Sequence, residues 1–212
     1  MQAKSNNANL FSERSVFVRL VNAKKSDKEL EEMPHRKFLD LAVIYEFRIY
    51  ATDGYWDYPI TTRMMEEWGL SEKELFELGM KNMWNMVGHG IYDCDEVLAF
   101  QEYGYDLKEL EEAAMIEPDK FYTFTAQPQV YGAVNILYPE LLHRFGEVAG
   151  SDYYILPCSV NEILMIIPGE YGLEDYIDLV RCGNRKTPRK EEILSNHVYM
   201  YHRDTGLIEI MA

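Results

Sequence analysis

Cysteine is scarce in this chain of 212 residues. Its three cysteines, Cys94, Cys158 and Cys182, are far apart and include no Cys-x-x-Cys pair. An odd number at such spacing is typical of neither a disulfide framework nor a zinc site. The sequence therefore predicts no metal site, and no phosphate-cradling glycine loop or other motif indicates a cofactor.

Long apolar runs are also absent. The longest, such as the run from Ile163 to Pro168, is far too short to cross a bilayer. The polar start MQAKSNNANLFSERS lacks the apolar core of a secretory signal. We therefore expect a cytoplasmic protein without a membrane partner.

Basic residues are few, with 21 Lys and Arg against 36 Asp and Glu and a formal net charge of -15. An acidic surface repels nucleic-acid phosphates and anionic lipid, because both bind through basic patches. We expect neither as a partner, and the charge favours solubility in any case. Hydrophobic residues make up 47% of the chain, which is enough for a packed core and excludes general disorder.

Short β-branched or alternating segments predict the strands. The clearest alternation runs from Leu39 to Ile49, where every odd position is apolar. A helix starting at Pro34 is an alternative there, but the alternation favours a strand. The other predicted strands are 16–22, 121–125, 133–138, 153–156, 163–167, 197–203 and 207–211, the last two forming a hairpin around Gly206.

Helices are predicted by their start signals and apolar periodicity. Ser71 and Glu74 form a capping box ahead of a helix over 71–86. Asp106 with Glu109 indicates a second helix, and further helices are expected over 139–148 and 173–181. Together these elements predict an α+β fold, with a mixed or largely antiparallel sheet of about seven strands and about four helices. We expect a flexible leader over 1–15 and a single domain over 16–212.

Several stretches together resemble a known family. They are Phe17–Asn22, Pro34–Arg36 running into Phe38–Ala42, Gly132–Ala133 with Leu137–Tyr138, Tyr154–Pro157 followed by Ser159 and Glu162, and Leu194–Ser195 with Val198–Tyr199. The family consists of uncharacterised bacterial proteins that share a domain of unknown function and are common in anaerobic gut bacteria. Its members often carry further sequence ahead of this part, which implies that the chain is a truncated form or a fragment. The resemblance implies no activity, cofactor or substrate.

The family's pattern Pro-Ser-Ser-x-His-Glu falls on residues 157–162, where this chain has Cys158 for the first serine and Asn161 for the histidine. Cys158 is the candidate nucleophile, and His143, His197 or His202 could be its base. Asn161 or Glu162 could orient that base, and Glu162 could also act as a base itself. A nucleophilic cysteine needs a lowered pKa. Alternatively, Cys158 is a small apolar filler at the end of a strand.

A second cluster, GHGIYDCDE, places His89, Asp93, Cys94 and Asp95 within seven residues. All three residue types are possible metal ligands. The spacing matches neither a zinc site nor a calcium loop, so we interpret the segment as a glycine-rich surface loop.

Five cations lie within ten residues of this acidic chain, namely Arg181, Arg185, Lys186, Arg189 and Lys190. They could receive a phosphate, a carboxylate or an acidic segment of a partner. The alternative is a solvated loop after a helix, where cations favour the carbonyl end. The segment is the predicted binding site.

The sequence leaves two hypotheses of function. One is a non-catalytic α+β module that binds a protein partner or a small ligand, favoured because no complete catalytic set is visible. The other is a small hydrolase or thiol-dependent enzyme centred on Cys158. Access to Cys158 and a hydrogen-bonded base would discriminate between them.

Overall fold

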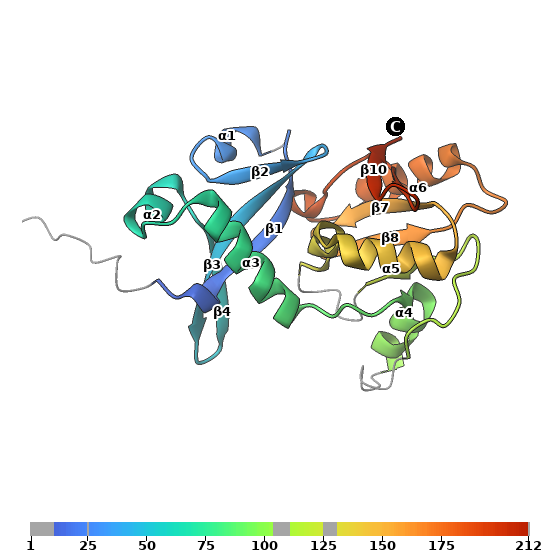
Figure 1. Cartoon of the computed structure of the whole chain (residues 1–212), viewed down its shortest axis with the longest axis horizontal. Helices are drawn as coiled ribbons and strands as arrows, with labels where there is room; N and C mark the ends of the chain where they lie inside the picture. Colours follow the sequence, from blue (N-terminus) through green and yellow to red (C-terminus); the bar gives the residue numbers. More distant parts are fainter. Residues whose placement is uncertain (1–10, 25, 104–110, 125–130, 212) are drawn as a thin grey trace, which may run out of the picture.

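The computed structural model describes residues 11–24, 26–103, 111–124 and 131–211. In this part of the chain, ten strands form two antiparallel sheets that lie side by side (Figure 1). The α+β class is confirmed. The prediction of one sheet with about seven strands is corrected, because strand pairing depends on contacts between distant segments that periodicity does not encode.

The first sheet is built around its longest strand, β3. Strand β1 pairs along one edge of β3, and β2 and β4 pair with successive parts of the other edge. The strand predicted from Leu39 is confirmed, although it begins two residues later. The strands are β1 Val16–Asn22, β2 His35–Phe38, β3 Leu41–Ala51 and β4 Gly54–Pro59.

The second sheet has the order β10-β9-β7-β8-β6-β5. Gly206 has a φ of 68° in the turn between β9 and β10, which confirms the predicted hairpin. The predicted strands from Tyr153 and Ile163 are also confirmed as neighbours. The strands are β5 Tyr92–Asp93, β6 Tyr122–Thr123, β7 Tyr153–Ser159, β8 Glu162–Ile166, β9 Tyr199–His202 and β10 Leu207–Ile210.

The helices include three that the sequence predicts. The backbone N–H of Glu74 donates to Ser71 Oγ, and the Ser71 N–H donates to Glu74 Oε2, so the predicted capping box is confirmed. The helices are α1 Asp27–Leu30, α2 Thr62–Glu67, α3 Glu72–Met86, α4 Cys94–Tyr103, α5 Pro139–Ala149 and α6 Leu173–Lys186. The first part of the helix predicted from Asp106 lies outside the described residues, and residues 111–114 are not helical.

The strand predicted over 133–138 is wrong. This segment is the 3₁₀ helix η4, Gly132–Leu137, and two shorter 3₁₀ helices are η2 Glu13–Ser15 and η5 Lys190–Glu192. Residues 132–136 are all buried, so consecutive side chains have no solvent-facing alternation. Asn135 supports the turn, because its Nδ2 donates to the carbonyl of Gly88 at 3.2 Å.

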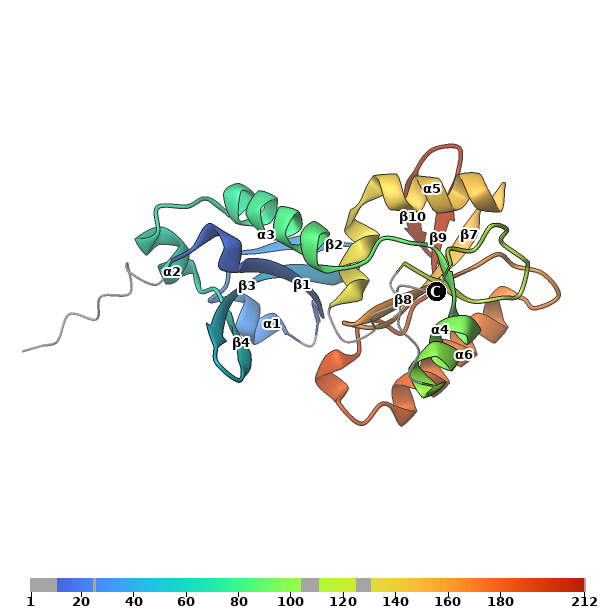
Figure 2. The same ribbon diagram turned by 90° about the horizontal axis from the view of Figure 1, so that it is seen from below.

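The two sheets share one hydrophobic core. Helices α5 and α6 cover opposite faces of the second sheet, and α3 crosses the first sheet (Figure 2). Buried Leu20 and Tyr45 of the first sheet belong to the same cluster as Phe145 of α5 and Tyr153 of β7. Within the predicted leader, Phe11 packs on Trp68, with ring centroids 4.9 Å apart.

Candidate functional site

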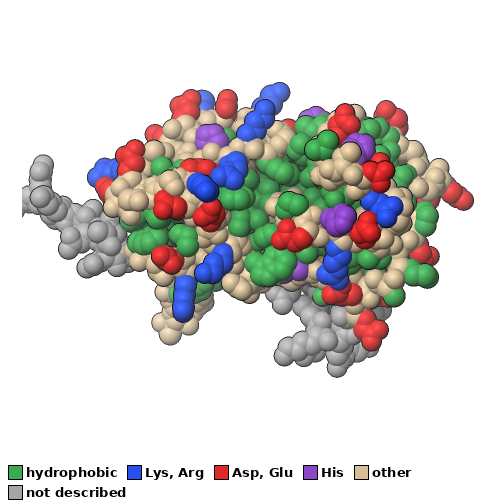
Figure 3. Space-filling view, viewed as in Figure 1, with side chains coloured by type: hydrophobic (Ala, Val, Ile, Leu, Met, Phe, Trp, Pro, Cys, Tyr) green, Lys and Arg blue, Asp and Glu red, His purple; other side chains and the backbone are tan. Residues whose placement is uncertain are grey.

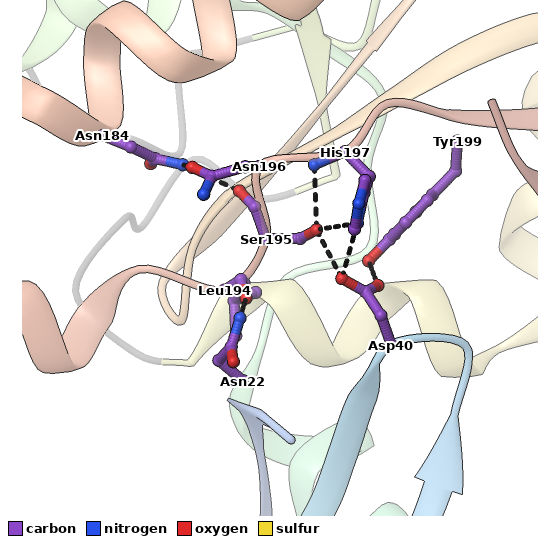
Figure 4. A network of polar contacts seen from close by, with 8 residues as sticks. All are labelled: Asn22, Asp40, Asn184, Leu194, Ser195, Asn196, His197 and Tyr199. Atoms are coloured by element: carbon purple, nitrogen blue, oxygen red, sulfur yellow. Dashed lines mark hydrogen bonds and ion pairs between the residues drawn. The ribbon is translucent and has the colours of Figure 1, made fainter. Parts of the chain in front are cut away.

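A partly buried polar network ties the first sheet to the C-terminal part of the chain (Figure 4). Asp40, in the turn between β2 and β3, accepts hydrogen bonds from Ser195 Oγ at 2.6 Å and from the Tyr199 hydroxyl. His197 Nδ1 lies 2.9 Å from the same carboxylate. Burial raises the pKa of Asp40, but hydrogen bonds from Ser195, Tyr199 and His197 lower it more, so the net pKa is lowered.

The network contains a serine, a histidine and an aspartate, but its geometry is not that of a catalytic triad. In a triad the serine and the carboxylate contact opposite ring nitrogens. Here Ser195 Oγ lies 3.1 Å from His197 Nδ1, the nitrogen that also faces Asp40. Ser195 is fully buried. The arrangement therefore holds two chain segments together and has no path for proton transfer from Ser195 through the ring.

The network continues to α6 through asparagine side chains. Asn184 Nδ2 donates to the Ser195 carbonyl at 2.7 Å and to Asn196 Oδ1 at 2.9 Å. On the other side, Asn22 Nδ2 donates to the Leu194 carbonyl at 2.5 Å. The segment 193–197, which we call the strap, is thus fixed between β1 and α6. Sequence reasoning missed this network, because its members are distant along the chain.

A cavity of about 340 Å³ opens between the last turns of α6 and the strap. Its lining brings together three of the five cations that the sequence predicted as a binding site. Lys190 also closes the helix, since its Nζ donates to the carbonyls of Asn184 at 2.9 Å and Arg185 at 3.0 Å. The lining residues are Arg181, Asn184, Arg185, Lys190, Ile193 and Asn196.

The cations of this cavity differ from most others in the molecule. Seven of the ten arginines form an ion pair with a carboxylate. Within the described residues, neither Arg181 nor Arg185 has a carboxylate within 4.0 Å. On the face that carries α3 and α5, by contrast, acidic and basic side chains are interspersed (Figure 3).

The other two predicted cations lie outside the lining. Arg189 Nη2 is 2.8 Å from Glu192 Oε1, an ion pair three residues apart on the surface. Lys186 is the last residue of α6 and is exposed. All five cations are exposed, so it is position relative to the cavity that separates these two from the three lining residues. Of the five cations in the predicted binding segment, Arg181, Arg185 and Lys190 line the cavity.

Cys158 lies near the end of β7 and packs against the core under α6. Burial and, to a smaller extent, the nearby carboxyl of Glu162 together raise its pKa to about 12. Burial also raises the pKa of Glu162 itself. A reactive cysteine needs a lowered thiol pKa, so the raised pKa of Cys158 opposes its activation as a thiolate.

The three candidate bases for Cys158 lie elsewhere. His143 is exposed on α5, which covers the opposite face of the sheet from Cys158. His197 faces Asp40, and His202 lies between the carboxylates of Asp152 and Glu209 at 3.0 and 3.3 Å. The structure therefore gives the predicted nucleophile no assembled partner among these residues.

The residues of the GHGIYDCDE cluster diverge in space. His89 stacks on Trp84, with ring centroids 3.8 Å apart, while Cys94 begins α4. Asp93 Oδ1 accepts from the Asp95 N–H at 2.8 Å, which is a local turn contact. Among the residues that the structure describes, no three His, Cys, Asp or Glu side chains are grouped to hold a metal ion.

Fold and site together define an acidic α+β protein with a cation-lined cavity beside a partly buried polar network. The chain belongs to a family of unknown function, DUF5688, whose sequence profile matches residues 7–203. The predicted resemblance to a domain of unknown function is thereby confirmed. No curated protein and no solved structure matches the chain. In the described part of the chain, every helix is too short or too polar to span a membrane.

Proposed function

We propose that this protein is a non-catalytic module that binds an anionic group of a small ligand or of a protein partner in the α6 cavity. One observation carries the proposal. Arg181, Arg185 and Lys190 line one cavity in a chain whose net charge is -15. Guanidinium and ammonium groups are the side chains that proteins use to bind phosphates and carboxylates.

The cations of the cavity repel each other when it is empty. Arg181 and Arg185 are four residues apart in α6, so they lie on one face, where like charges destabilise a helix by about 0.2–0.5 kcal/mol. The C-terminal end of the helix carries the equivalent of about half a negative charge, which offsets part of the positive charge of the two arginines. Some of these carbonyls already accept hydrogen bonds from Thr187 and Lys190. A bound anion would neutralise the remaining positive charge.

The walls of the cavity are held in place before any ligand arrives. Asn184 is only 7% exposed and is fixed by its bonds to Ser195 and Asn196. Ser195 is in turn fixed by Asp40. Asn184 and the strap therefore form an ordered frame, whereas the side chains of Arg181 and Arg185 are exposed. Binding costs the conformational entropy of these two side chains but not that of the frame. The ordered frame supports a binding site rather than a solvated loop.

We do not extend the proposal to a thiol-dependent reaction at Cys158, since the raised pKa of its thiol opposes one. A non-catalytic role predicts that the protein binds anions without turning them over.

Thermal unfolding of the full chain tests the proposal. Acetate, succinate and phosphate are titrated at constant ionic strength against chloride. A bound anion raises the unfolding midpoint with its concentration, because it binds only the folded state. The rise is expected to disappear in the double variant Arg181→Gln/Arg185→Gln. It should persist in Lys186→Gln, which removes a charge on the same helix outside the cavity. A rise that survives in the double variant, or none with any anion, would refute the proposal.

A further inference from the structure

We infer that the anionic group bound in the α6 cavity is a phosphomonoester, an inference that rests on the proposed function. The charge of the lining is the first reason. Three cations line the cavity, and its remaining lining residues, Asn184, Ile193 and Asn196, are neutral. A carboxylate carries one negative charge, whereas a phosphomonoester carries about 1.5 to 2 at neutral pH. The doubly charged group matches three cations better.

The directions of the donors are the second reason. Arg181 and Arg185 reach the cavity from α6, Lys190 from η5 and Asn196 from the strap. A carboxylate accepts hydrogen bonds mainly in its own plane, where the fork of one guanidinium takes two of its acceptor positions. The three terminal oxygens of a phosphoryl group point in different directions and accept bonds from several sides. Donors on three separate elements therefore fit a phosphoryl group.

Within the described part of the chain, Asn196 and Lys190 still have N–H groups that their hydrogen bonds do not use. Asn196 accepts from Asn184 through Oδ1, so the two N–H bonds of its Nδ2 are directed elsewhere. The Lys190 ammonium has three donors, and the carbonyls of Asn184 and Arg185 take two of them. The described residues take no more than these two, so the third N–H of Lys190 can donate to a ligand.

Ile193 adds a small apolar surface to the lining of the cavity. It is the apolar member of the lining and is 5% exposed, so it offers a small apolar wall for the organic part of the ester. The volume of about 340 Å³ is at the lower end of ligand pockets, which span about 300–1,000 Å³. The part of the ester that enters the cavity is therefore compact. A free small molecule and a phosphorylated side chain of a protein segment both supply this chemistry.

Isothermal titration of the full chain separates these cases. The titrants are inorganic phosphate, free phosphoserine, a phosphoserine peptide, its unphosphorylated form, and succinate, all at one ionic strength. We expect phosphate and phosphoserine to bind, and succinate to bind about tenfold more weakly or not at all. Arg185→Gln is expected to weaken phosphoserine binding about tenfold, and the matched variant Lys186→Gln to change it less than about twofold.

Each outcome has a distinct meaning. Succinate binding as tightly as phosphoserine would overturn the phosphomonoester inference and leave anion binding in place. Failure of every anion would overturn both. Equal losses in Arg185→Gln and Lys186→Gln would show attraction by overall charge and would overturn the site. If the phosphorylated peptide binds more tightly than free phosphoserine, the ligand is a phosphorylated protein segment. If the two bind equally, it is a small molecule.

Discussion

Asp40 shows how a single side chain links segments that are far apart in the sequence. Its carboxylate accepts bonds from Ser195 and Tyr199 and faces His197, all more than 150 residues away. The hydrogen bonds stabilise the ionised form against the cost of partial burial. Because the folded pKa is lowered, this stabilisation is present above the unfolded pKa of about 3.9 and is lost as pH falls through the folded value.

Replacing Asp40 by Asn keeps the shape but removes the charge and one of the two acceptor oxygens. We expect Asp40→Asn to reduce the free energy of unfolding at neutral pH by about 1.5–3 kcal/mol, as for the loss of hydrogen bonds to a charged group. Urea unfolding measures the change, with Asp53→Asn, an exposed carboxylate in the turn after β3, as the control. A change within about 0.5 kcal/mol would mean that the network adds little stability.

The thiol of Cys158 supplies a second prediction at this scale. Its pKa of about 12, against 9.0 for an unperturbed thiol, lowers the thiolate fraction at neutral pH about a thousandfold. Alkylation of Cys158 in the folded protein should therefore be slow and should accelerate on unfolding in urea. Mass spectrometry of the three cysteines against time measures this. Rapid modification of Cys158 in the folded state would instead favour a thiol-dependent enzyme.

Among the secondary-structure elements, α3 packs unusually close to β1. A Cβ atom added at Gly79 would lie 2.6 Å from Val18 Cγ1 and 3.2 Å from the Phe17 backbone. Gly79→Ala is expected to destabilise by about 1–3 kcal/mol through overpacking, despite the better helix propensity of alanine. Gly183→Ala in α6 meets open space and should stabilise by about 0.5–1 kcal/mol. Unfolding midpoints of both variants check the contrast; the same sign for both would contradict it.

The β9–β10 hairpin carries a pH-sensitive contact. Hydrogen bonds to Asp152 and Glu209 raise the pKa of His202. Because the folded pKa is raised, the stabilisation is fully present below the unfolded pKa of about 6.5 and is lost as pH rises through the folded value.

His202→Gln should therefore lower the unfolding free energy more at about pH 5.5 than at about pH 8.5. Urea denaturation at both values measures the difference. His143→Gln, an exposed histidine on α5, is the control. An equal effect of His202→Gln at both pH values would show that charge plays no part in the contact.

The whole molecule has two sheets, and its largest hydrophobic cluster spans both of them, from Leu20 and Tyr45 to Phe145 and Tyr153. Two smaller clusters lie within one half each, one between the second sheet and α6 and one beside α1. The strap adds polar contacts between the same halves. Shared burial couples the unfolding of the sheets, because neither can separate without exposing the other's apolar surface.

This coupling predicts one cooperative transition. Tryptophan fluorescence reports the first sheet and its helices, since Trp56, Trp68 and Trp84 all lie there. Access of a thiol reagent to Cys158 reports the second sheet. We expect both signals to change at the same urea concentration. Separate midpoints would show two independent domains and contradict the single domain predicted over 16–212.

Local patterns made much of the fold predictable. The capping box at Ser71 and the alternation after Leu39 each depend on residues within a few positions, and both predictions were confirmed. The strand predicted at Ala133 was wrong, because a short apolar run has the same composition in a buried 3₁₀ helix. The partition into two sheets escaped prediction, because long-range pairing has no local signal.

The candidate site likewise combines features that the local sequence determines with features that depend on long-range contacts. The sequence by itself determined the acidic composition, a helix over 173–181, and the gathering of five cations within ten residues. The structure extends this helix to Lys186, so that it carries Arg185 as well as Arg181. Only the tertiary structure decided which of these cations line a cavity. Lys190 returns to the end of α6 by binding its carbonyls, and the strap is brought there by contacts with Asn22 and Asp40. Such contacts depend on packing between distant segments, and no short stretch of sequence encodes them.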